Sequence, residues 1–143
     1  MTLQLSVDEL ELLVRSFEDP KVASPTDEHQ TRLVMSLWYL LHYEETLATE
    51  RFIRALRRRD RDRTLSAPPH SAYHETLTLF WLGIARRFLE RAGRHASTVD
   101  LVNDFLVEYG STPGLIFEYY REPTLRSHEA RYFWVPPDIK PLN

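Results

Sequence analysis

Apolar residues recur at three- and four-residue spacing along most of the chain, which is the spacing of one face of an α-helix. The first predicted helix starts at Ser6, which has the spacing of a capping box with Glu9, and it ends before Pro20. No alternating strand pattern extends beyond a few residues, so the pattern predicts an all-α fold. The apolar face of this first helix consists of Leu10, Leu13, Val14 and Phe17.

The second helical segment is long, and its apolar face changes direction. We expect it to start at Ser24 and Pro25, with proline at the first helical position, and to reach about Arg59. A straight helix packed on one core would keep a single apolar face, so the change predicts a bend or break near residues 43–46. The two faces consist of Leu33, Val34, Leu37, Leu40 and Leu41, and then of Phe52, Ile53 and Leu56.

The pattern in the second half of the chain predicts further helices of decreasing length. Residues 60–69 are a polar connection ending in prolines, and a third long helix is predicted over residues 70–91. Ser97 opens a fourth helix, which Gly110 closes. Short helices are expected at 115–120 and 127–131, separated by Pro123, before an extended tail. Residues 1–143 are therefore predicted to form a single domain, a compact bundle of about five helices with an irregular C-terminal segment.

Composition is that of an ordinary soluble globular domain, with 43% hydrophobic and 27% charged residues among 143. The longest apolar run, residues 79–85, is far shorter than the roughly 20 residues of a transmembrane helix, so no membrane partner is expected. The N-terminal residues lack the basic and continuous apolar stretches of a secretory signal, which favours a cytoplasmic protein. The absence of cysteine excludes disulfides, Cys-type metal sites and thiol nucleophiles.

Charge is distributed unevenly along the chain. Residues 1–50 have 3 basic and 10 acidic side chains, whereas residues 51–100 have 11 and 5. The arginines within 51–63 could neutralise phosphates. However, Asp60 and Asp62 interrupt that run, and the acidic N-terminal third is available to pair with it. We therefore expect intramolecular ion pairs, and nucleic acid is not the expected partner.

Side chains that could bind a metal ion or take part in catalysis are concentrated at the start of the third long helix. His70 and His74 are four residues apart, a spacing that lets two imidazoles of one helix reach a common metal ion. Tyr73 lies at the edge of the same predicted face. The segment is not the HExxH zinc signature, because Ser71 stands where that signature has its glutamate and Glu75 follows the second histidine.

The second helical segment supplies a further candidate ligand, His29. This residue lies on the apolar face of the segment, one turn inside the predicted helix. If the segment doubles back at its break, its first half runs parallel to the third long helix, and His29 and His74 face each other. The resulting hypothesis has His29, His74 and His70 as ligands of a divalent metal such as zinc, iron or nickel, or as groups that polarise a small molecule. Glu75 and Tyr73 are the candidate catalytic proton donors or acceptors.

The alternative is a non-catalytic interaction or ligand-binding module with structural histidines. Near a helix N-terminus, the helix dipole disfavours protonated histidine, and such residues are commonly neutral and hydrogen-bonded. In that case the aromatic C-terminal segment would dock a partner or a second copy in a homo-oligomer. Ring nitrogens of His29 and His74 close together beside a pocket would favour the first hypothesis, and histidines capped by backbone carbonyls would favour the second.

Several short patterns lie within residues 26–142: residues 27–29 leading to 38–40, residues 73–76 followed by Thr78, and the closing 129–131, 134–135 and 137–138. Together they resemble an uncharacterised family of bacterial all-helical proteins. The resemblance implies an all-helical fold and directs attention to His29, Tyr73, His74 and Glu75, but it brings no activity, cofactor or partner. His70 is not part of the family pattern.

Overall fold

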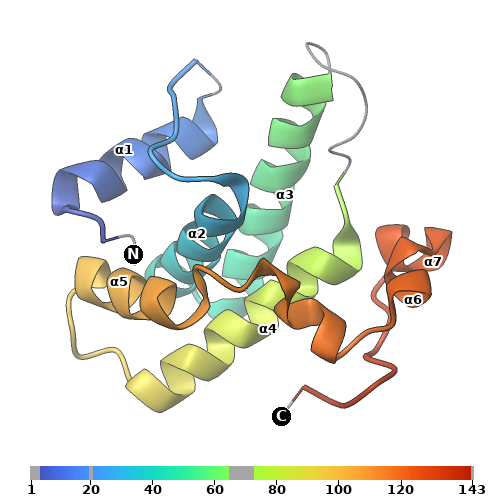
Figure 1. The fold of residues 1–143 in the computed structure, drawn as a ribbon. Helices are drawn as coiled ribbons and strands as arrows, with labels where there is room; N and C mark the ends of the chain where they lie inside the picture. Colours follow the sequence, from blue (N-terminus) through green and yellow to red (C-terminus); the bar gives the residue numbers. More distant parts are fainter. Residues whose placement is uncertain (1–3, 20, 65–72, 143) are drawn as a thin grey trace.

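The computed structural model describes residues 4–19, 21–64 and 73–142, and within these ranges its regular elements are all helical. This confirms the all-α prediction with about five substantial helices and a C-terminal part of short turns (Figure 1). The substantial helices are α1 (Val7–Glu18), α2 (Glu28–His42), α3 (Glu45–Thr64), α4 (Glu75–Ala92) and α5 (Thr98–Tyr109). The C-terminal part contains the 3-10 helix η1 (Pro113–Glu118) and the short helices α6 (Glu122–Arg126) and α7 (His128–Tyr132).

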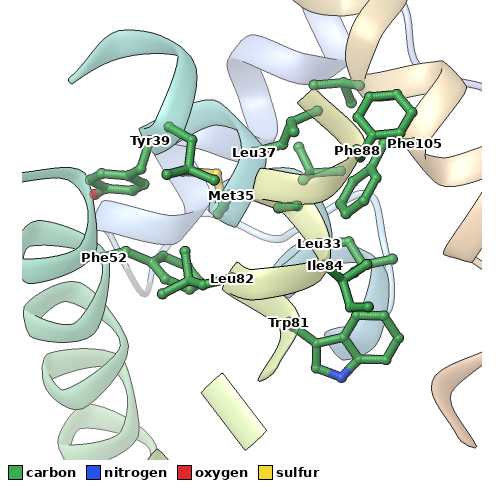
Figure 2. Packing of buried hydrophobic residues seen from close by; sticks show 14 of the residues in the cluster. Leu33, Met35, Leu37, Tyr39, Phe52, Trp81, Leu82, Ile84, Phe88 and Phe105 are labelled. Carbon is green, nitrogen blue, oxygen red and sulfur yellow. The ribbon is translucent and has the colours of Figure 1, made fainter. Parts of the chain in front are cut away.

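Helix α2 lies at the centre, with α1, α3, α4 and α5 packed around it (Figure 1). Its consecutive residues Leu33, Val34 and Met35 have no exposed surface, so α2 is buried around most of its circumference. Figure 2 shows its side chains between Phe52 of α3 on one side and α4 on the other. The aromatic rings of the surrounding core include Trp81, Phe88 and Phe105.

The break in the second helical segment lies where the change of apolar face predicts it. Helix α2 ends at His42, Tyr43 is extended, and α3 begins at Glu45. The Glu44 side chain accepts a hydrogen bond from the backbone N–H of Leu47 at 2.8 Å, which caps the first turn of α3. The predicted start at Ser24 and Pro25 is wrong. Asp27 caps α2 instead, because it forms a capping box with Gln30 that satisfies two backbone N–H groups.

The start predicted for the third long helix is also wrong. Helix α4 begins at Glu75, and His74 is its N-cap with extended backbone angles (φ −128°, ψ 112°). The His74 ring accepts the hydrogen bond from the backbone N–H of Leu77 that a serine or aspartate side chain usually accepts at this position. His74 therefore lies before the first turn of α4 and not on its face, and His70 lies outside the described residues.

The C-terminal segment is tied to α4 and η1 by side chains that bond to backbone. Thr76, which is fully buried, donates to the carbonyl of Phe133 at 2.8 Å and accepts from the N–H of Val135 at 3.1 Å. The Tyr120 hydroxyl donates to the Val135 carbonyl. These bonds hold the extended tail against the bundle. No helix in the described ranges is long and apolar enough to cross a membrane.

Asn103 of α5 connects this helix to the N-terminal segment, because its side-chain amide exchanges two hydrogen bonds with the backbone of the buried Leu5, at 2.7 and 2.9 Å. We expect Asn103→Ala to lower the free energy of unfolding by about 2–4 kcal/mol, since it leaves two buried backbone groups without partners. Urea unfolding measures the change. Asp104→Ala, at an exposed neighbouring position, is the control, and equal losses in the two variants would contradict the prediction.

Candidate functional site

His29 and His74 line one cavity of about 400 Å³, which we call the histidine pocket. The N-terminal ends of α2 and α4 form one side, and η1 and α6 form the other. Much of its wall is apolar, and charged side chains stand among these groups. The apolar members are Leu77, Trp81, Pro113, Ile116, Phe117 and Leu125, and the charged members are Glu28, Arg32, Glu122 and Arg126.

His29 is held in the pocket by a hydrogen bond and a ring contact. Its Nε2 lies 3.0 Å from the carbonyl oxygen of Tyr109, and its ring meets Trp81 edge-on with centroids 4.9 Å apart. A carbonyl only accepts, so Nε2 bears the proton and Nδ1 keeps its lone pair. Partial burial lowers the pKa of His29 below 6.5, because desolvation disfavours the charged ring more than the Tyr109 carbonyl favours it. Neutral His29 is thus an acceptor beside the pocket.

His74 uses both ring nitrogens for hydrogen bonds within the protein. Nε2 donates to the carbonyl of Leu125 at 2.8 Å, while Nδ1 accepts from the N–H of Leu77 at 3.1 Å. The ring therefore fixes the first turn of α4 against α6 and leaves no lone pair for a metal ion in this arrangement. The rings of His29 and His74 each bond to a backbone carbonyl. This is the arrangement expected for structural histidines.

Tyr73 and Glu75 flank His74 in the sequence, but neither side chain lines the histidine pocket. The Tyr73 hydroxyl donates to Glu75 at 2.5 Å, and the guanidinium carbon of Arg57 lies 5.0 Å from the centre of the Tyr73 ring. Burial, together with the hydrogen bond to Glu75, raises the pKa of Tyr73 far above 10, so the hydroxyl stays protonated. Tyr73 lines a second cavity along α3, not the histidine pocket.

The predicted site residues thus separate into two pairs: the structure brings His29 together with His74, and Tyr73 together with Glu75. Within residues 4–19, 21–64 and 73–142, no group of three or more histidine, aspartate or glutamate side chains is placed to hold a metal ion. The described residues therefore supply no cluster for zinc, iron or nickel.

Sequence reasoning missed the wall opposite the histidines. Ile116, Phe117 and Leu125 complete the pocket from the C-terminal part of the chain. The exposed fraction of Phe117, 51%, shows that its ring sits at the rim. Short irregular elements have no long apolar period, so no local signal in the sequence indicates which cavity their side chains line.

No protein-family model matches this sequence, and searches of curated proteins and of solved structures found no similar protein. The resemblance to a family of bacterial helical proteins therefore stays a prediction.

The lowered pKa of His29 makes stability dependent on pH. Unfolded chains bind the His29 proton more readily than the folded state, so we expect the free energy of unfolding to fall as pH decreases from about 6.5 toward the lower pKa of the folded state. His29→Gln, which keeps a donor for the Tyr109 carbonyl, should lose that contribution. Urea unfolding between pH 7.5 and 5 compares the two proteins. Parallel curves, or an NMR titration that places His29 at or above 6.5, would contradict the assignment.

Proposed function

We propose that this chain is a small-molecule-binding protein and that its ligand occupies the histidine pocket. The observation that supports this most is a largely apolar cavity of about 400 Å³ with one neutral imidazole acceptor beside it. Ligand sites in proteins combine these features: a cavity of roughly 300–1,000 Å³, mostly apolar walls and a few placed polar groups.

The wall of the pocket defines the class of ligand. Leu77, Trp81 and Ile116 favour a flat aromatic or apolar body, because such a body releases water from apolar surface. Nδ1 of His29 accepts no hydrogen bond from another described residue, so it favours a ligand with an N–H or O–H donor. The proposed ligand is therefore a small organic molecule with an apolar ring and one hydrogen-bond donor.

Ligand binding is better supported than acid–base catalysis by His74, Tyr73 or Glu75. A general base needs a free lone pair within hydrogen-bond reach of the substrate, and both His74 nitrogens are already engaged. Glu75 accepts from Tyr73 outside the pocket, so neither of these candidate proton-transfer groups lines it. This distribution supports the interpretation in which the histidines build and line a binding site.

We expect indole, which has an aromatic body and an N–H donor, to bind in the histidine pocket more tightly than 1-methylindole, which lacks the donor. A difference of about threefold to tenfold corresponds to one neutral hydrogen bond. Titration of ¹⁵N-labelled protein measures both affinities, and the amide signals of Leu77, Phe117 and Leu125 should shift.

Two variants and a control make this test specific. His29→Leu should abolish the preference for indole, and Phe117→Ser should weaken the binding of both compounds. Phe133→Ser, which removes an aromatic ring outside the pocket, should change neither affinity. Failure of both compounds to bind, or shifts confined to other regions, would refute the proposal.

A second candidate function is self-association through the C-terminal aromatic side chains. Phe133 is 66% exposed, and its neighbours Tyr132 and Trp134 are also largely exposed. Consecutive exposed aromatic residues are typical of surfaces that another protein covers.

Sedimentation equilibrium tests this candidate. Self-association predicts a mass that rises above 16.9 kDa with concentration, and Phe133→Ser should suppress the rise. Val107→Ser, at an equally exposed apolar position on α5, is the matched control. A constant mass of 16.9 kDa at all concentrations would rule the candidate out.

A further inference from the structure

A second cavity, of about 820 Å³, runs along α3 on the side that faces Tyr73 and α7, and we call it the arginine cleft. Helix α3 contributes Ile53, Arg54 and Arg57, and α7 contributes Arg131 and Tyr132. Tyr73 stands between these helices, at the start of the segment that leads into α4. The arginine cleft therefore combines cations from two distant parts of the sequence with two phenol rings.

Among the arginines that line the arginine cleft, Arg54, Arg57 and Arg131 are weakly neutralised by the protein. In the described part of the chain, the guanidinium groups of Arg54 and Arg131 form no hydrogen bond or ion pair. Arg57 lies 3.7 Å from a Glu75 oxygen, and that same oxygen already accepts the short hydrogen bond from Tyr73. The pairing expected between the arginine run and the acidic N-terminal third is formed by Arg59 with Glu28, outside this cleft.

Four arginines line the cleft, since Arg61 also belongs to its wall. Like charges repel one another, and a bound anion converts that repulsion into attraction. Guanidinium groups are suited to this because their planar N–H donors match the oxygens of a phosphate or carboxylate in pairs. The rings of Tyr73 and Tyr132 and the side chain of Ile53 supply apolar surface beside the charges. Glu50 and Asp60 also line the cleft and limit its positive charge, which favours a small anion over a polyanion.

We propose that the arginine cleft binds a small organic anion, whose phosphate or carboxylate contacts Arg54, Arg57 and Arg131 and whose ring lies against Tyr73 and Tyr132. This site is separate from the histidine pocket, and the inference does not depend on the function proposed for that pocket. Tyr73 and His74 are adjacent in sequence but line different cavities, so the two sites lie on either side of the start of α4.

Matched probes test the charge requirement. Isothermal titration calorimetry compares 1-naphthyl phosphate, 1-naphthoate and 1-naphthol, which share one ring system and differ in charge. We expect at least one of the two anions to bind about tenfold more tightly than 1-naphthol, as a charge-assisted hydrogen bond implies. The tighter of the two anions identifies which group the cleft prefers. Equal affinity for 1-naphthol, or no binding of either anion, would overturn the proposal.

Arginine variants test the location. Arg131→Gln and Arg54→Gln should each weaken the preferred anion about fivefold or more, because each removes one charged contact. Arg58→Gln is the matched control, because this substitution changes the net charge by the same amount. Arg58 is exposed on α3, the helix that contains Arg54, and does not line the cleft. Equal weakening by all three variants would indicate diffuse attraction and overturn the proposal.

NMR shifts distinguish the two cavities. Titration of ¹⁵N-labelled protein with the preferred anion should shift the amide signals of Tyr73 and Tyr132. Shifts confined to Leu77 and Phe117 would place the anion in the histidine pocket and overturn the assignment. Circular dichroism of each variant establishes that the exposed substitutions leave the helices intact.

Discussion

Burial of α2 on nearly all sides is the constraint from which the rest of the structure follows. Leu33, Val34, Met35 and Leu37 point in different directions around the helix and all are fully buried, so neighbours must cover most of its sides. Helix α3 reaches one side because the chain turns sharply after His42, and α4, α5 and α1 cover the others. The N-terminal end of α2 is thereby brought beside the start of α4, where the histidine pocket forms.

Side chains that bond to distant backbone carbonyls complete this arrangement. His29 reaches Tyr109 at the end of α5, His74 reaches Leu125 in α6, and Thr76 holds the extended segment at Phe133. The bonds from His74 and Thr76 give partners to carbonyls in the C-terminal part of the chain, where short elements satisfy few backbone groups by themselves. His29 and His74 also line the histidine pocket, so these two residues contribute both to the stability of the fold and to the shape of the pocket.

The two cavities differ in electrostatic character because different elements supply their walls. The histidine pocket has a neutral imidazole among apolar side chains from α4, η1 and α6, which suits an uncharged ring. The arginine cleft collects cations from α3 and α7, which suits an anion. Tyr73 and His74 separate them, since consecutive residues in extended backbone point to opposite sides.

The sequence alone determined the helical class, the capping box at Ser6 and the break after α2, because these depend on periodicity and on contacts between residues a few positions apart. The sequence-based prediction placed the starts of α2 and α4 too early, because several polar residues near each start could serve as the N-cap. The helical face assumed for Tyr73 and His74 failed because His74 is the cap, and 100° steps do not extend beyond a helix N-terminus. Only the tertiary structure decided which carbonyls the Nε2 atoms of His29 and His74 reach and which arginines converge. These partners lie 50 or more residues apart in the chain, and local pattern contains no information about them.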